Sequence, residues 1–234
     1  MEQTFKEKMI KKCPELTKKM QQQFEDYMKL LLEWNEKINL TAITEEDDII
    51  LKHFIDSLTI SKYIEDGKSM VDVGTGAGFP GIPIKIARNN IKVTLVDSLN
   101  KRILFLNDII EKLGLQQVDT LHYRAEEFGQ NKKYRESFDI ATSRAVANLS
   151  TLVEYLLPLV KVGGICICMK GSEIQDELKN AKKAIQVLGG KIESVEEFTL
   201  PESDIKRNIV IIKKIASTPN RYPRKPGTPA KEPL

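Results

Sequence analysis

The chain has 234 residues, of which 41% are hydrophobic and 29% are charged, with a formal net charge of +3. A chain of this length and composition can bury a core without disulfide staples, which excludes disorder as its main state. It has no run of about 20 apolar residues to span a membrane, and charges occupy the place where a signal peptide needs an apolar run. We expect a cytoplasmic protein with one α/β domain and an appendage.

Three cysteines and two histidines are too few and too scattered for a zinc site or a disulfide framework. Cys166 and Cys168 alternate in a strand-like run, which places both on one face as small core residues. We therefore predict no metal. Three free thiols suit a reducing cytoplasm.

Residues 1–66 are predicted to form a helical extension. Apolar residues from Met20 to Trp34 recur at three- and four-residue steps, as on an amphipathic helix. Thr44 followed by four acids indicates a helix start, and Ile49–Ile64 contains a second apolar stripe. Since two helices alone bury little surface, we expect them to pack on the domain that follows.

In residues 67–216, short apolar strands alternate with helices. We expect strands at Met70–Val73, Ile91–Val96, Val118–His122, Phe138–Thr142 and Ile165–Met169, and helices at Ile82–Ala87, Lys101–Leu113, Leu149–Val160 and Glu173–Leu188. The last runs, Lys191–Thr199 and Ile205–Ile215, are linked too closely for a parallel crossover, which predicts an antiparallel pair. The alternation is typical of a doubly wound, mostly parallel α/β sheet. With its hairpin it resembles the seven-stranded, Rossmann-like sheet of methyltransferases.

The strongest local signal is the glycine-rich segment Val71–Gly81, between a strand and a helix. Glycines there let the chain turn sharply and let a ligand approach the backbone. The glycines at 76, 78 and 81 fit the dinucleotide pattern G-x-G-x-x-G, whereas Asp72 and the glycines at 74, 76 and 78 fit D-x-G-x-G-x-G, which resembles motif I of S-adenosylmethionine-dependent methyltransferases. Asp72 favours the second pattern, because its carboxylate would repel a pyrophosphate and suits a ligand with an ammonium group. A plain strand–helix turn stays open.

Further candidates follow the next strands, at the edge where open α/β sheets bind ligands. Asp97 can accept hydrogen bonds from ribose hydroxyls, or cap the helix that follows. Ala125 and Glu126 are placed near the adenine end of such a site, although Glu126 could simply be an acid in a first helical turn. Arg144 can hold a carboxylate or phosphate, or form a surface ion pair, and Lys170 has a similar position.

The C-terminal tail, residues 217–234, carries four basic residues against one acid and five of the ten prolines. Such a segment cannot form a helix or central strand, so we expect it to run extended over a surface or dock on an anionic partner. Contacts to RNA are expected from Arg221, Arg224 and Lys225 of the tail and from Lys170, with Tyr222 stacking on a splayed base. In that case the tail leaves cofactor affinity nearly intact. The alternatives are a solubilising terminus, or a tail that packs on the domain and only stabilises it.

Together these segments resemble the RsmG (GidB) family, which methylates N7 of a guanine in 16S ribosomal RNA. The resemblance rests on VDVGTGAGFPGIPIKIA at 71–87, LVDSLNKRILFL at 95–106, YRAEE at 123–127, SRAVANL at 143–149, MKG at 169–171, WNEKINLTAI at 34–43, HFIDSL at 53–58 and RYPRKPGTPAKEPL at 221–234. It implies a class I methyltransferase fold, S-adenosylmethionine as methyl donor, and 16S rRNA or the small ribosomal subunit as substrate. It also implies cofactor contacts at Gly74, Phe79, Ala125, Glu126 and Arg144. The glycine loop adds Gly76 and Gly78.

Guanine N7 carries a lone pair and no proton, so we predict no catalytic base. The base must lie in a loop or be splayed out, because A-form grooves hide N7. Two other classes stay open: a nicotinamide-dependent oxidoreductase, and a non-catalytic RNA-binding or assembly protein on the same fold. We expect a monomer that binds neither DNA nor membrane.

Overall fold

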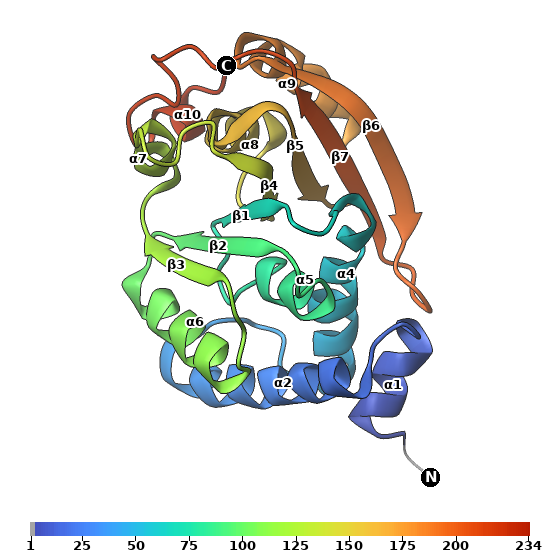
Figure 1. The fold of residues 1–234 in the computed structure, drawn as a ribbon. Coiled ribbons are helices and arrows are strands. Elements are labelled where there is room, and N and C mark those ends of the chain that lie inside the picture. Colours follow the sequence, from blue (N-terminus) through green and yellow to red (C-terminus); the bar gives the residue numbers. More distant parts are fainter. Residues whose placement is uncertain (1–2) are drawn as a thin grey trace.

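The computed structural model describes residues 3–234, and its centre is a seven-stranded sheet in the order β3-β2-β1-β4-β5-β7-β6 (Figure 1). The strands are β1 (Ser69–Val73), β2 (Lys92–Asp97), β3 (Val118–His122), β4 (Phe138–Arg144), β5 (Val160–Lys170), β6 (Gly190–Thr199) and β7 (Lys206–Lys214). All pairs among β1 to β5 are parallel, whereas β7 is antiparallel to both β5 and β6. The predicted mostly parallel sheet with an antiparallel hairpin is confirmed.

Helices cover both faces of this sheet (Figure 1). They are α1 (Phe5–Lys12), α2 (Lys18–Ile38), α3 (Glu46–Asp48), α4 (Asp56–Leu58), α5 (Gly81–Ala87), α6 (Asn100–Lys112), α7 (Ala125–Gln130), α8 (Leu149–Leu156), α9 (Gln175–Val187) and α10 (Thr228–Lys231), with a π-helix η1 (Ile49–Ile55) and 3-10 turns η2 (Ser61–Tyr63) and η3 (Leu157–Leu159). No helix in the described range is both long and apolar enough to cross a membrane.

Two apolar cores form because successive strand residues point to opposite faces of the sheet. Met70 belongs to the core shared with α2, α5 and α6, and its neighbour Val71 belongs to the core shared with α8 and α9. Cys166 and Cys168 are both fully buried in the second core, as predicted.

The helical extension packs on the sheet domain, as expected. The apolar face of α2 buries Phe24, Tyr27 and Leu31 in the same core as α5 and α6. The division into an extension of residues 1–66 and a domain of residues 67–216 stays a prediction.

The second apolar stripe of the extension is not one continuous α-helix. It divides into α3, η1, α4 and η2, with η1 in π-helical geometry. Backbone carbonyls in η1 serve side chains as well as the helix, because Ser57 Oγ donates to the carbonyl of His53 at 2.5 Å and Arg144 donates to that of Lys52 at 3.0 Å. Such π-turns frequently occur at functional sites.

The expectation of a helix-free tail is wrong. The tail ends in the short helix α10, which begins after Gly227 and has Pro229 in its first turn, where a missing N–H costs nothing. Pro229 is buried and its carbonyl accepts a hydrogen bond from Thr151 of α8 at 2.9 Å. Packing against α7 and α8 therefore fixes the conformation of the tail (Figure 1).

Candidate functional site

Two cavities open at the carboxyl edge of the parallel strands, where such sheets bind ligands. The first, of about 310 Å³, is lined by residues that include Gly74, Ala125 and Val146, and is called here the glycine-loop cavity. The second, of about 600 Å³, is called the β4 cavity and is lined by the ends of β4 and β5, the start of β7, and the η1–α4 segment. Ala145 lines the second and Val146 the first, so the loop after β4 separates them.

The glycine loop joins β1 to α5 in a conformation that requires glycine. Gly74 and Gly76 have φ values of +69° and +62°, which L side chains disfavour. Asp97 at the end of β2 holds this loop: its Oδ2 accepts the N–H of Gly76 at 2.9 Å and its Oδ1 accepts the N–H of Leu99 at 2.9 Å. Arg102 also pairs with it at 3.2 Å. Asp97 thus supports the glycine loop and also caps the backbone before α6, and its contact with the ribose stays a prediction.

Asp72 is fully buried at the end of β1. Its Oδ2 accepts hydrogen bonds from Thr75 Oγ1 at 2.7 Å and from the N–H of Gly81 at 2.9 Å, whereas Oδ1 has no partner among residues 3–234. Burial raises the pKa of Asp72 to about 7. A buried carboxylate oxygen without a donor is uncommon, and a cationic ligand beside the loop would favour its ionised form. This arrangement fits the expected zwitterionic cofactor.

Ala125 and Glu126 begin α7 and line the glycine-loop cavity together. Glu126 is 7% exposed, and its Oε1 accepts the backbone N–H of Gly227 at 2.8 Å. No group in the described part of the chain donates to its Oε2. The position of Glu126 fits the predicted adenine contact, which stays a prediction.

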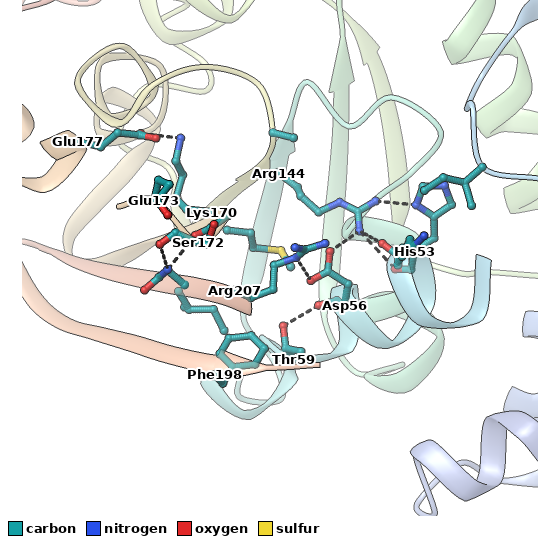
Figure 2. A pocket seen from close by; sticks show the side chains of 17 residues that line it. His53, Asp56, Thr59, Arg144, Lys170, Ser172, Glu173, Glu177, Phe198 and Arg207 are labelled. Atoms are coloured by element: carbon teal, nitrogen blue, oxygen red, sulfur yellow. Dashed lines mark hydrogen bonds and ion pairs between the residues drawn. The ribbon is translucent and has the colours of Figure 1, made fainter. Parts of the chain in front are cut away.

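Arg144 lines the β4 cavity and reaches to the helical extension (Figure 2). Its Nη1 donates to Asp56 Oδ2 at 3.1 Å, while Arg207 Nε donates to Asp56 Oδ1 at 3.0 Å. The Asp56 side chain is only 4% exposed, so two guanidinium groups satisfy a buried carboxylate. Arg144 is not among the residues that line the glycine-loop cavity, and its contact with the cofactor stays a prediction.

His53 lies beside Arg144 (Figure 2). Its Nδ1 is 3.2 Å from Arg144 Nη2, and its Nε2 is 2.9 Å from Thr41 Oγ1. Burial, and then the charge of Arg144, lowers the pKa of His53 to about 4. The ring is therefore neutral at pH 7, and we assign Nδ1 as acceptor from Arg144 and Nε2–H as donor to Thr41.

Phe79 connects the two parts of the site by packing. It is 5% exposed and lines neither cavity, but its ring stacks on His53 at 4.4 Å and on Tyr27 at 5.4 Å between centroids. The guanidinium of Arg144 lies 5.0 Å from the same ring. Tyr27 also donates its hydroxyl to the carbonyl of Ala77 at 2.5 Å. The extension therefore supports the glycine loop, whereas a contact of Phe79 with the cofactor stays a prediction.

Two further side chains of the β4 cavity come from β5 and β7. Lys170 pairs with Glu177 at 2.7 Å and donates to the carbonyl of Ala147 at 2.8 Å, which ties down the loop after β4. Asn208 is 1% exposed, and its Nδ2 donates to the carbonyl of Gly171 at 2.8 Å. Its Oδ1 accepts no hydrogen bond from any described residue. Asn208 thus offers an acceptor to a ligand in this cavity.

The tail residues predicted to bind RNA differ in their availability. Tyr222 is 6% exposed and belongs to the second core, so its ring is not free to stack on a base in this conformation. Arg224 forms a two-pronged ion pair with the buried Glu154, with Nη2 at 2.7 Å from Oε2 and Nε at 2.9 Å from Oε1. Arg221 and Lys225 are exposed, and their contacts with RNA stay predictions.

Several residues of the β4 cavity were assigned no role from the sequence, namely His53, Asp56 and Asn208. The segment HFIDSL at 53–58 contributed to the family resemblance without a function of its own. Its role depends on partners 88 and 151 positions away along the chain, which no local pattern reveals.

Comparisons with known proteins give a consistent result. Residues 20–210 match the family model GidB, described as rRNA small subunit methyltransferase G. The chain is 54% identical over 215 residues to the ribosomal RNA small subunit methyltransferase G of Alkaliphilus metalliredigens, covering 91% of this chain and 90% of the relative. It is 56% identical over 209 residues to the protein of that name from Acetivibrio thermocellus, covering 89% and 86%.

Solved structures resemble the chain in fold. The precorrin-6y C5,15-methyltransferase of Geobacter metallireducens aligns with a TM-score of 0.50 at 16% identity, covering 76% of this chain and 91% of that one. TYW2 of M. jannaschii, solved in complex with AdoMet, aligns with a TM-score of 0.55 at 12% identity, covering 68% and 75%. At such identities the likeness extends to the fold alone.

Proposed function

Since the chain belongs to the family of small-subunit rRNA methyltransferases G, we propose that it transfers a methyl group from S-adenosylmethionine to N7 of a guanine in 16S ribosomal RNA. The family match over residues 20–210 carries the reaction class. The arrangement of the site supports separate binding of the methyl donor and of the acceptor base, because two cavities adjoin across the loop after β4. One cavity takes the methyl donor and the other takes the acceptor base.

We assign the cofactor to the glycine-loop cavity. The bare backbone at Gly74 allows close approach of a ligand. We assign Asp97, at the end of β2, to the ribose and Glu126, which lines the cavity, to the adenine. The ionised form of Asp72 suits the positive charge of the ligand. When bound, S-adenosylmethionine supplies a methyl group activated by its sulfonium centre.

We assign the acceptor guanine to the β4 cavity. Phe198 and Met169 provide apolar wall for a base, and Asn208 Oδ1 can accept a hydrogen bond from the donor edge of guanine. The paired Arg144 and Asp56 keep the wall between the cavities fixed. No residue needs to remove a proton from N7, so the protein has to orient the base in line with the methyl group, within about 3–3.5 Å, and to exclude water.

The reaction requires a guanine that lies in a loop or is splayed out of its helix, since A-form grooves hide N7. The exposed cations Arg221 and Lys225 are suited to phosphates near the site. We propose 16S rRNA or the small ribosomal subunit as the partner, and a cytoplasmic monomer as the active form.

Competitive binding tests the assignment of the cofactor. Calorimetry should show that S-adenosylmethionine binds in a one-to-one ratio while NADH does not bind. Binding of NADH in place of S-adenosylmethionine would favour the oxidoreductase that the glycine pattern alone left open, and would refute the proposed function.

A further inference from the structure

We propose that the C-terminal tail is part of the cofactor site: through Gly227 it holds the carboxylate of Glu126 in the position from which that side chain reads the adenine ring. The proposal rests on the proposed function, because it assumes S-adenosylmethionine in the glycine-loop cavity. It replaces the expectation that cofactor affinity is independent of the tail.

Glu126 lies between the cofactor cavity and the tail. It lines the glycine-loop cavity and also a third cavity, of about 270 Å³, whose other walls include Pro223 and Arg224 of the tail. The N–H of Gly227 donates to Glu126 Oε1 at 2.8 Å, and Glu126 is only 7% exposed. A backbone N–H on a carboxylate is a charge-assisted hydrogen bond, so it fixes one oxygen strongly. The other oxygen, Oε2, is left for a ligand donor.

The tail also grips the rest of α7, the helix that carries Glu126. Gln130 at the end of α7 donates to the carbonyl of Pro223 at 2.6 Å. Pro223 packs directly on the backbone at Gly129, because a Cβ added there would lie 2.7 Å from Pro223 Cγ. Both ends of α7 are therefore held by one short segment of the tail.

The tail itself is anchored to the domain by further contacts, so its position beside α7 is fixed. Arg224 forms its two-pronged ion pair with Glu154, whose side chain is 0% exposed. Arg135 donates to the carbonyls of Tyr222 and Thr218, both at 2.7 Å. Tyr222 is buried in the core beneath these contacts. Tyr222 and one of the four tail cations, Arg224, therefore attach the tail to the domain, whereas Arg221 and Lys225 stay exposed.

This arrangement predicts a specific chemical effect. With Oε1 held by Gly227, the free oxygen of Glu126 presents an acceptor to the exocyclic amino group of adenine. A purine with a carbonyl oxygen at that position offers no such donor and meets the carboxylate unfavourably. The tail should therefore matter for recognition of adenine, and not only for stability.

The experiment compares binding of S-adenosylhomocysteine with binding of S-inosylhomocysteine by calorimetry at 15 °C. The test variant lacks residues 226–234 and keeps the anchor at Tyr222 and Arg224. Its control lacks only residues 232–234. In a second pair of variants, Arg224→Gln is the test and Lys225→Gln is its control. Each variant removes one cation from the tail, but only Arg224 forms an ion pair with Glu154.

We expect wild type to prefer the adenine ligand, and expect both the 226–234 truncation and Arg224→Gln to lose about tenfold affinity for it. Affinity for the inosine ligand should stay within about twofold, so the preference should nearly disappear. The two controls should match wild type. An unchanged preference in the test variants, or an equal loss for both ligands, would overturn the proposal and leave the tail a structural role only.

Hydrogen exchange on the ligand-free proteins separates this proposal from the proposed function. The 226–234 truncation should speed exchange in α7 and leave β1 and β2 protected. If wild type bound neither ligand, the proposed function would fail, even with faster exchange in α7. If wild type bound both and α7 exchange stayed unchanged on truncation, only the role of the tail would be refuted.

Discussion

Asp56 and Arg207 lie 151 positions apart in the sequence, yet Arg207 Nε donates to Asp56 Oδ1 at 3.0 Å. The other oxygen of Asp56 accepts a hydrogen bond from Arg144 at 3.1 Å. The helical extension, the end of β4 and the start of β7 therefore meet at one buried carboxylate. As a result, the extension forms part of the wall of the β4 cavity and is more than an appendage to the sheet domain.

We predict that Arg207→Gln lowers kcat/KM for the RNA substrate by about tenfold, because Asp56 loses one of its two charged partners beside the β4 cavity, which we propose for the acceptor base. Affinity for S-adenosylmethionine should change by less than about twofold. Lys206→Gln is the matched control, since it removes the same charge from an exposed neighbour. Equal effects of the two substitutions on methyl transfer would contradict a role for the ion pair.

The glycine loop gives a second prediction. Gly76→Val should abolish cofactor binding, because it forces a side chain onto a residue with φ of +62° and into open space beside the loop. Gly114→Val provides the control: Gly114 also has φ of +62° and open space around it, but lies in the turn between α6 and β3. Calorimetry on both folded variants is the measurement. Normal cofactor affinity in Gly76→Val would show that the loop does not contact the ligand.

Asp97→Ala should weaken cofactor binding by about 1.5–3 kcal/mol, as expected for the loss of charge-assisted hydrogen bonds. It should also lower the free energy of unfolding, because the N–H groups of Gly76 and Leu99 both lose their acceptor. Asp119→Ala, an exposed acid on the neighbouring strand, serves as the control. Calorimetry and urea unfolding measure the two effects. If affinity were unchanged while stability fell, Asp97 would support the loop without binding ribose.

Asp72 predicts a pH dependence of stability. Burial raises the pKa of Asp72 to about 7 in the folded protein from its ordinary value of 3.8, so the folded state holds the proton more tightly than the unfolded chain. Its contribution to stability is complete below about pH 4 and is lost as the pH rises through about 7. The unfolding free energy of wild type minus that of Asp72→Asn should therefore fall by about 2 kcal/mol between pH 5 and pH 8. A constant difference across this range would mean that Asp72 is ionised throughout.

Local sequence patterns were sufficient for most of the fold. The strand Val118–His122 has the bounds that were expected, and Lys101–Leu113 differs from α6 by one residue at each end. These elements are readable because their apolar period and their flanking glycines are local signals. The π-helical geometry of Ile49–Ile55 could not be predicted in this way. It depends on side chains from elsewhere in the chain, such as Arg144, that donate hydrogen bonds to the backbone carbonyls of this segment.

Some candidate site residues could also be named from local signals in the sequence. Strand ends and glycine motifs indicated Asp72, Asp97 and Glu126 directly. The β4 cavity could not be predicted, because it forms only where distant segments meet at Asp56. Tyr222 illustrates the converse error: a basic, proline-rich context suggested an exposed ring, but long-range packing buries it.

Transfer of isotopically labelled methyl from S-adenosylmethionine to naked 16S rRNA, isolated small subunits and assembled ribosomes tests the central claim most directly. We expect label in one or more of these substrates, confined to 16S rRNA, and recovered as N7-methylguanine after nuclease digestion and mass spectrometry. The Gly76→Val protein should transfer none. A folded wild-type protein that binds S-adenosylmethionine but labels no guanine N7 in any of the three substrates would contradict the account.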